Sequence, residues 1–343
     1  MWVVATSQPP LKNIKLGILS KCLIVLSDHT LGLICVQTCK LFLIENVMTS
    51  SSQNNGTMLA ITAYSFWGLI PIFFKTLDAA GPGEILAHRI LWSFLLLGLL
   101  LKALAKTDDF FSTLKKLSRL APLMLSSLLI SINWLVFIWA INSERILETS
   151  LGYYINPLVS VFLATMVLKE KLSRLQLVAI TIAALGVLNQ LFVFGQVPWV
   201  ALTLAFSFGG YGLIRKKISV DPFVGLTVET FMLLPIAAGY LLMLQNSGES
   251  VFLQKDLTLD MLLIFSGAVT AFPLIVFAAA ARRLTLTALG LFQYIAPSVS
   301  FLLAVLLYGE SFGLPELITF ALIWTALAIF CIDSLHSRNK KAG

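Results

Sequence analysis

The chain has 343 residues, of which 58% are hydrophobic and only 12% are charged. A soluble protein of this length could not bury so much apolar surface, and its exterior would lack polar groups. The composition therefore excludes an ordinary soluble enzyme, a disordered chain and a disulfide-stapled secreted domain, and it predicts that the surrounding solvent is largely lipid.

The net charge of +7 raises the question of a nucleic-acid partner. Most Lys and Arg residues, however, stand in short clusters between apolar runs, as positive charge does on the cytoplasmic loops of membrane proteins. We therefore expect no nucleic acid to bind. Cys22, Cys35, Cys39 and Cys331 lack the paired spacing that is typical of zinc sites, so we expect neither a metal nor a cofactor.

The first residues do not fit the pattern of the rest of the chain. Residues 1–47 are apolar in part, but Lys21, Asp28 and Lys40 interrupt the apolar stretch. The segment also lacks the compact apolar core and cleavage site of a secretory signal. We interpret it as an extension that function does not need, with Met48 as an alternative start.

Ten runs are long and apolar enough to cross a bilayer, which takes about 20 residues. Only 105–119 and 245–258 look like substantial loops between them. The predicted spans are 57–77, 84–104, 120–141, 148–168, 175–193, 197–214, 222–244, 259–281, 286–308 and 314–333.

Loop charges support this set of spans. If the first span begins in the cytoplasm, the basic clusters at 102–119, 169–174, 215–217, 282–283 and 338–341 all fall on the cytoplasmic side. The opposite side then holds Lys75, Arg145 and Lys255. A missed span would scramble this alternation, so we predict that both ends of the ten-helix core are cytoplasmic.

The two halves of the chain resemble each other. A shift of 140 residues places Leu151, Tyr154, Ile155, Pro157 and Glu170 on Leu291, Tyr294, Ile295, Pro297 and Glu310. A unit of five helices must re-enter the membrane from the other side when it is repeated. The sequence therefore predicts two inverted five-helix repeats, an architecture typical of secondary transporters with a site between the repeats.

Ionisable residues inside spans are costly in lipid and usually face a cavity or a partner. His88 and Arg89 interrupt the second span and Glu229 interrupts the seventh, and the repeat makes Arg89 the counterpart of Glu229. Because the repeats are inverted, we expect these two residues to lie about 10 Å apart along the membrane normal. We expect both to line one central path, in which Glu229 binds a proton or a cationic group. The alternative is that His88 and Arg89 anchor the protein at the outer interface.

Uncharged polar and aromatic residues mark further candidate substrate contacts. Pro157 and Pro297 each free a carbonyl group within a span, and protein or a wet cavity must satisfy that group. The same residues are equally suited to hold helices together through hydrogen bonds. The candidates are Asn133, Trp134, Tyr154, Asn156, Gln293 and Tyr294.

Six motifs in order carry a resemblance to a known family. They are AHRILWS (87–93), NWLVFIWA (133–140), SLGYYINPL (150–158), YGLIRKK (211–217), GLTVET (225–230) and GLFQYIAP (290–297). They resemble the RarD family, the chloramphenicol-sensitivity proteins of the EamA branch of the drug/metabolite transporter superfamily.

The resemblance implies an all-α permease of the bacterial inner membrane, with ten transmembrane helices in two inverted EamA-type repeats. These repeats would be 57–193 and 197–333, followed by a cytoplasmic basic tail at 334–343. Residues 1–56 would have no family counterpart.

We therefore predict a secondary transporter, not an enzyme, because no paired nucleophile and base stand out. No nucleotide partner is expected, since the chain contains no phosphate-binding G-x-x-x-x-G-K-[ST] loop. The expected substrate is a small amphipathic metabolite or drug, with chloramphenicol-type compounds among the candidates. A membrane sensor or scaffold that transports nothing is the alternative, and a homodimer remains open.

Overall fold

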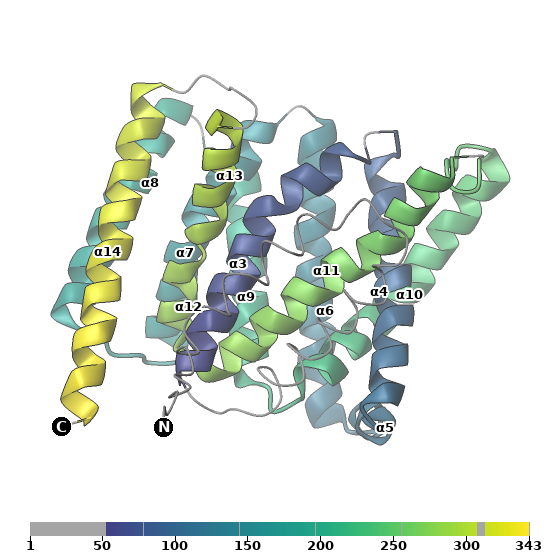
Figure 1. The fold of residues 1–343 in the computed structure, drawn as a ribbon, viewed down its shortest axis with the longest axis horizontal. Coiled ribbons are helices and arrows are strands. Elements are labelled where there is room, and N and C mark those ends of the chain that lie inside the picture. Colours follow the sequence, from purple (N-terminus) through teal and green to yellow (C-terminus); the bar gives the residue numbers. More distant parts are fainter. Residues whose placement is uncertain are drawn as a thin grey trace, which may run out of the picture. The chain divides into compact units, whose positions relative to one another are not determined.

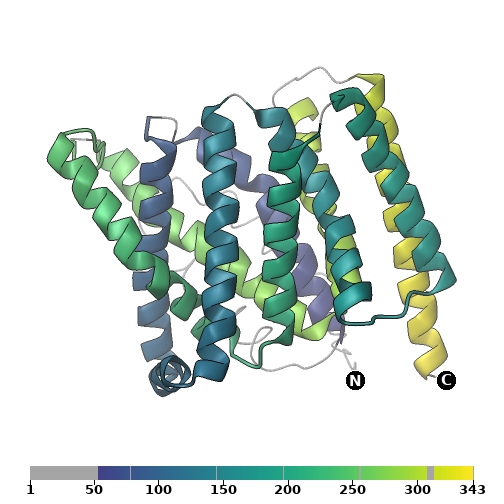
Figure 2. The same ribbon diagram turned by 180° about the vertical axis from the view of Figure 1, so that it is seen from behind.

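The structure, a computed structural model, describes residues 53–306 and 313–342, apart from residues 78, 144, 196 and 255. The predicted extension at 1–47 lies outside the described residues. The described part is helical (Figures 1 and 2). Its helices are α3 (Gln53–Lys75), α4 (Pro82–Ala103), α5 (Thr107–Lys115), α6 (Leu117–Asn142), α7 (Ile146–Val167), α8 (Arg174–Phe194), α9 (Trp199–Lys217), α10 (Pro222–Ser247), α11 (Leu257–Arg283), α12 (Leu286–Phe292), α13 (Ile295–Leu306) and α14 (Leu314–Ala342).

The predicted spans coincide with these helices to within a few residues at most ends, with three differences. The loop predicted at 105–119 is wrong, because α5 and the start of α6 lie within it. The ninth span is not one helix, because it breaks into α12 and α13 around Gln293 and Tyr294. At the other end of the chain, α14 continues past residue 333 to Ala342, so the predicted tail is helical.

Length and composition allow eight described segments to cross a membrane. These segments lie in α3, α4, α6, α8, α10, α11, α14 and the combined α12–α13 region. Large apolar side chains cover the outside of the helices, and Leu99, Phe192 and Ile236 are 70%, 83% and 73% exposed. Such an exterior suits contact with lipid tails. The protein is thus a multi-pass membrane protein.

Local sequence signals explain several helix starts. Ser173 and Gln176 form a reciprocal capping box at the start of α8. Asp221 accepts hydrogen bonds from the first amides of α10, and Pro222 occupies the first helical position, where a missing N–H costs nothing. Asp256 caps α11 in the same way. Polar capping residues thereby set where these three helices begin.

Helices of the first half, α3 to α8, pack mainly against those of the second half, α9 to α14, and the pattern is reciprocal. The α3·α11 contact has its counterpart in α9·α6, and α3·α12/α13 has its counterpart in α9·α7. The α4·α11 contact has its counterpart in α10·α6. When the two halves are exchanged, the contacts α4·α10, α7·α12 and α8·α14 are each their own counterpart. The two halves are therefore interleaved rather than placed side by side.

An aromatic cluster joins α3 of the first half to α9 and α11 of the second half. Tyr64 and Trp67 of α3, Phe208 and Tyr211 of α9 and Phe277 of α11 have ring centroids 5.4–6.2 Å apart in their contacting pairs. Tyr64, Tyr211 and Phe277 are almost completely buried. This cluster therefore holds α3, α9 and α11 together.

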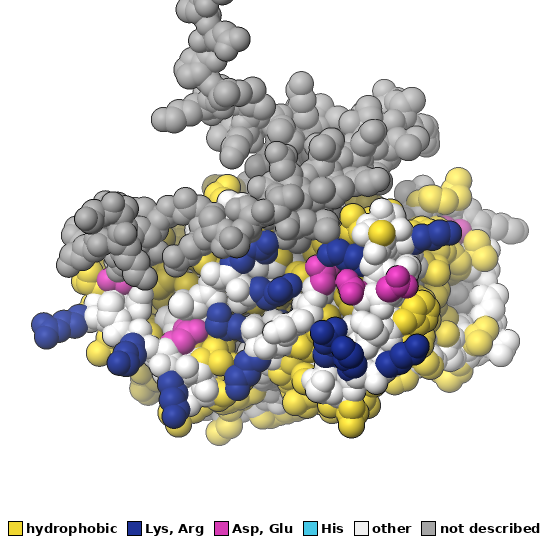
Figure 3. Space-filling view, turned by 90° about the horizontal axis from the view of Figure 1, so that it is seen from below, with side chains coloured by type: hydrophobic (Ala, Val, Ile, Leu, Met, Phe, Trp, Pro, Cys, Tyr) yellow, Lys and Arg dark blue, Asp and Glu magenta, His cyan; other side chains and the backbone are white. Residues whose placement is uncertain are grey.

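Basic side chains gather at one end of the helices. Figure 3 views the end at which α5 lies, and Lys and Arg side chains spread across that end with few acidic side chains between them. The segments that connect α4 to α6, α7 to α8 and α9 to α10 reach this end (Figures 1 and 2). Three of the basic clusters that the sequence assigns to one side of the membrane, 102–119, 169–174 and 215–217, thus share one end of the structure.

Candidate functional site

Arg89 lies on α4 among residues from three other helices. Its Nε donates a hydrogen bond of 2.7 Å to the Oγ1 of Thr270 on α11. Its guanidinium carbon lies 5.2 Å from the ring centroid of Phe74 on α3 and 5.3 Å from that of Trp134 on α6. Both distances are in the range of cation–π attraction. The sequence candidates Arg89 and Trp134 therefore meet at one point between the halves.

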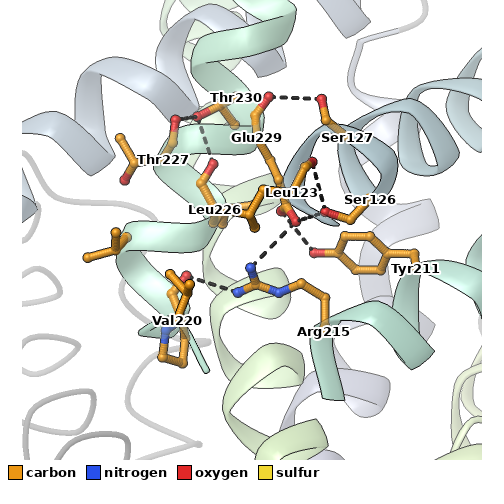
Figure 4. A network of polar contacts seen from close by, with 12 residues as sticks. Leu123, Ser126, Ser127, Tyr211, Arg215, Val220, Leu226, Thr227, Glu229 and Thr230 are labelled. Carbon is orange, nitrogen blue, oxygen red and sulfur yellow. Dashed lines mark hydrogen bonds and ion pairs between the residues drawn. The ribbon is translucent and has the colours of Figure 1, made fainter. Parts of the chain in front are cut away.

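Glu229 on α10 has a different set of neighbours (Figure 4). Its carboxylate accepts hydrogen bonds from Ser126 Oγ at 2.5 Å and Tyr211 Oη at 3.3 Å, and it forms an ion pair with Arg215 Nη1 at 3.5 Å. Ser127 donates to the backbone carbonyl of Glu229 at 3.2 Å. The side chain of Glu229 is only 1% exposed, so its charge is enclosed and neutralised where α6, α9 and α10 meet.

Arg215 was missed as a site residue because it begins the basic run at 215–217, which the sequence analysis assigns to a cytoplasmic loop. In the structure Arg215 instead lies within α9, and its side chain is 1% exposed. Its Nη2 also donates to the carbonyl of Pro222 at 3.2 Å. The available signal was spacing, because Arg215 lies one helical turn after Tyr211 and Glu229 lies one turn after Gly225.

Gly225 makes the ion pair sterically possible. A Cβ atom at this position would lie 2.1 Å from Arg215 Nη1. Only a glycine therefore lets the guanidinium reach Glu229 across the face of α10.

His88, although next to Arg89 in sequence, faces another part of the structure. Its Nδ1 accepts a hydrogen bond from Trp92 Nε1 at 3.1 Å, and its ring lies 4.6 Å from that of Phe252. Its buried Nε2 has no hydrogen-bond partner among the described residues. A small pocket of about 200 Å³ adjoins it, lined by His88, Leu91, Leu241, Leu242, Gln245, Ser250 and Phe252.

The loop beside this pocket is held by Glu84. One of the carboxylate oxygens of Glu84 accepts hydrogen bonds from Ser250 Oγ and from the amides of Val251 and Phe252. The start of α4 is thereby joined to the segment that connects α10 and α11. His88 belongs to this end of the helices rather than to the surroundings of Arg89.

Asn133 serves the contact between α6 and α9. Its amide nitrogen donates to the carbonyl of Leu204 at 2.9 Å and to Ser207 Oγ at 3.0 Å. Both acceptors belong to the protein, so the described contacts of Asn133 match the helix-joining alternative.

The four remaining candidates gather where α7 meets the break between α12 and α13. Tyr294 Oη donates to the carbonyl of Tyr154 at 3.2 Å, and Gln293 Oε1 accepts from Ser160 Oγ at 3.5 Å. The buried Oδ1 of Asn156 has no partner among the described residues. Tyr154 and Tyr294, which the repeat makes counterparts in the fourth and ninth spans, are thus in contact.

Glu170 also links the halves, at the basic end. Its carboxylate accepts hydrogen bonds from the amides of Leu286 and Thr287 and from Thr287 Oγ1, at 2.8–3.0 Å. A carboxylate at this position satisfies the free amides and favours the helix dipole of α12. The residue therefore caps a helix of the other half, not the helix that follows it in the chain.

Two described arginines near the candidate residues are held in ion pairs, whereas Arg89 is not. Glu229 with Arg215 and Glu148 with Arg145 are close ion pairs within or beside the helices, whereas the described residues include no carboxylate within 4 Å of Arg89. Within the described ranges no group of three His, Cys, Asp or Glu side chains is arranged to hold a metal ion. Most of these side chains thus join helices to one another, and the only hydrogen bond that Arg89 donates to a described residue is the one to Thr270.

Comparison with known proteins identifies the family. Residues 54–190 match the model of the EamA-like transporter family. An uncharacterized transporter of Vibrio cholerae is 48% identical over 292 residues, which cover 84% of this chain and 97% of that protein. The protein RarD of Salmonella typhi is 46% identical over 294 residues, which cover 86% of this chain and 100% of RarD. The chain belongs to the RarD proteins of the EamA-like transporter family.

A solved structure supports the fold independently. One crystal structure superposes with a TM-score of 0.63 at 18% identity, covering 82% of this chain and 98% of the other. The relatives at 46–48% identity confirm the family resemblance seen in the sequence motifs, and the Vibrio cholerae relative and the family model are both named for transport.

Proposed function

We propose that this RarD-family protein is a secondary transporter of the bacterial inner membrane that moves a small amphipathic metabolite or drug by alternating access. Two inverted five-helix repeats, 57–193 and 197–333, rock against each other around a shared site. The reciprocal helix contacts support this arrangement, since exchanging the halves reproduces the same set of pairings. A chloramphenicol-type compound is one candidate substrate.

The observation that carries the proposal is the position of Arg89. A cation inside a span normally faces a partner or a wet cavity. Arg89 on α4 contacts α11 of the second half and, through aromatic rings, α3 and α6 of the first half. Rocking of the halves would change this contact set, so a substrate bound there would be sensitive to the transport cycle.

We also propose a role for Glu229 in proton coupling. Protonation of its carboxyl would break the ion pair with Arg215 and loosen the junction of α6, α9 and α10. Coupling would follow if the two conformations of the transporter hold this proton with different affinities. A proton gradient would then drive the change between the two conformations through protonation of Glu229 in this buried pair.

Reconstitution in liposomes tests the transport proposal. Uptake or counterflow of labelled chloramphenicol and of a panel of amphipathic metabolites supports a transporter. Binding without flux would instead identify a sensor or scaffold, and the transport proposal would then be wrong.

A second measurement tests the proton role. Glu229→Gln is expected to abolish the dependence of flux on an imposed pH gradient, whereas Glu84→Gln, which alters another buried carboxylate, should retain it. The double variant Glu229→Gln/Arg215→Met serves as a further form if the single variant does not fold. Unchanged pH dependence in a folded Glu229 variant would exclude this role.

A further inference from the structure

Three arginines packed against described helices differ in how their charge is neutralised. Arg215 holds Glu229, and Arg145 holds Glu148 at 2.5 Å. Arg145 also lies over two rings, with its guanidinium carbon 5.6 Å from Trp139 and 5.1 Å from Trp199. Arg145 therefore matches the aromatic setting of Arg89 and adds the carboxylate that Arg89 lacks.

The guanidinium of Arg89 has unused hydrogen-bond donors. Only its Nε donates to a described residue, Thr270. The two terminal nitrogens donate to no described residue. Arg89 is only partly buried, and these nitrogens form a fork of N–H groups whose geometry matches a carboxylate.

The surroundings of this fork are aromatic. Phe74 and Trp134 lie against the guanidinium. Apolar walls beside a single cation suit a ligand with one negative charge and a flat apolar body. A phosphate dianion would instead leave one negative charge uncompensated in a low-dielectric region.

We propose that Arg89, Thr270, Phe74 and Trp134 form the binding site for a monovalent organic carboxylate with an aromatic or broad apolar group. The carboxylate takes both terminal nitrogens of the guanidinium, and the apolar body packs on the rings. This inference deepens the proposed transport function by naming its substrate class, and it rests on that function for its physiological meaning. Binding itself can be tested without transport.

The experiment compares acids with their neutral amides on purified protein in nanodiscs. The labelled probes are benzoate and benzamide, phenylacetate and phenylacetamide, and indole-3-acetate and indole-3-acetamide. At pH 7 at least one acid is expected to bind about 10- to 100-fold more tightly than its amide, as hydrogen bonds to a charged group provide. If no acid of the panel binds more tightly than its amide, the proposal is wrong, and this comparison needs no variant.

Variants then test whether Arg89 causes the preference for the acid over its amide. Arg89→Gln should remove the preference for the acid while leaving the weak binding of the amide. Arg89→Lys, which keeps the charge but loses the fork, should retain only part of it. Arg145→Gln is the matched control and should retain all of it. A folded Arg89→Gln protein with an undiminished preference would overturn the assignment, as would chloride binding at Arg89 that no acid displaces.

Flux is measured separately, so that the two proposals fail in different ways. An acid that binds through Arg89 but shows no counterflow leaves the anion site intact and contradicts the transport function. Counterflow of neutral compounds without any preference for acids supports the transport function and contradicts the anion site.

Discussion

At the residue scale, the buried pair of Arg215 and Glu229 depends on both of its charges being present. Each side chain is 1% exposed, so removing one partner leaves the other charge without compensation. We expect Arg215→Met to lower the free energy of unfolding by about 3–5 kcal/mol, as breaking buried pairs does. The double variant Arg215→Met/Glu229→Gln should be more stable than Arg215→Met alone, as measured by apparent Tm in detergent. If the loss of stability in the double variant equals the sum of the losses in the two single variants, Arg215 and Glu229 are not coupled.

Gly225 provides a second residue-scale prediction. Its replacement by Ala forces the guanidinium of Arg215 away, because the new Cβ would lie 2.1 Å from Nη1. We expect a loss of about 1–3 kcal/mol, which is typical of overpacking, seen as a lower apparent Tm. Gly98→Ala on α4, where a Cβ would meet nothing within 4 Å, is the control and should not lower Tm. Equal effects at the two positions would mean that the close contact at Gly225 has no energetic role.

The sequence could predict that Arg89 and Glu229 matter, but not which residues they meet. Both interrupt apolar spans, and lipid makes such charges conspicuous. Their partners come from helices far away in the chain, and a one-dimensional pattern contains no information about which helix faces which. Arg215 was overlooked because an arginine at the end of a span resembles a loop charge until its burial is known.

At the element scale, we expect that Pro297 contributes to the break between α12 and α13. Proline has no N–H and cannot donate to the carbonyl of Gln293, four residues earlier. In the structure that carbonyl accepts from the amide of Ala296 at 3.1 Å instead. The proline in the sequence predicted a freed carbonyl there, but not the end of α12. Pro157, at the equivalent position in α7, lies within a continuous helix, and nothing in the structure explains this difference.

Restoring the missing donor should repair the break. Pro297→Ala supplies an N–H that can bond to the Gln293 carbonyl, so hydrogen exchange of peptides across 289–298 should slow. Pro157→Ala should change exchange across α7 much less, because that helix is already continuous. Mass spectrometry of the protein in detergent provides the measurement. Faster exchange in Pro297→Ala would indicate that other contacts, not the proline, keep the two helices apart.

The start of α12 supplies another prediction at this scale. Glu170 accepts hydrogen bonds from the Leu286 and Thr287 amides, which would otherwise lack a partner. Glu170→Ala should therefore lower stability by about 0.5–2 kcal/mol, as the loss of a helix cap does. Lys171→Ala, which changes an exposed neighbour, should leave the apparent Tm unchanged. A variant at Glu170 as stable as the unaltered protein would show that water replaces the cap.

At the scale of the whole molecule, helix boundaries were predictable while helix pairing was not. Long apolar runs, caps and basic clusters are local features, and they placed most helix ends within a few residues. The short helix α5 was not predicted because its sequence, with Asp108, Asp109 and Lys115, is as polar as that of a loop. The interleaving of the two halves depends on side-chain packing between distant segments, and only the three-dimensional structure reveals it.

The inverted-repeat arrangement makes a prediction about sidedness that no single residue determines. An odd number of spans per repeat requires the segments after Lys116 and after Lys217 to lie on the same side of the membrane, and the segment at Glu249 on the other. Lys217 is suitable because it is the last residue of α9 and is exposed. Fusions of green fluorescent protein and alkaline phosphatase at these three points should report cytoplasm, cytoplasm and exterior. If the reporters after Lys116 and Lys217 instead face opposite sides, the halves are not inverted, and a shared site that opens alternately to each side loses its structural basis.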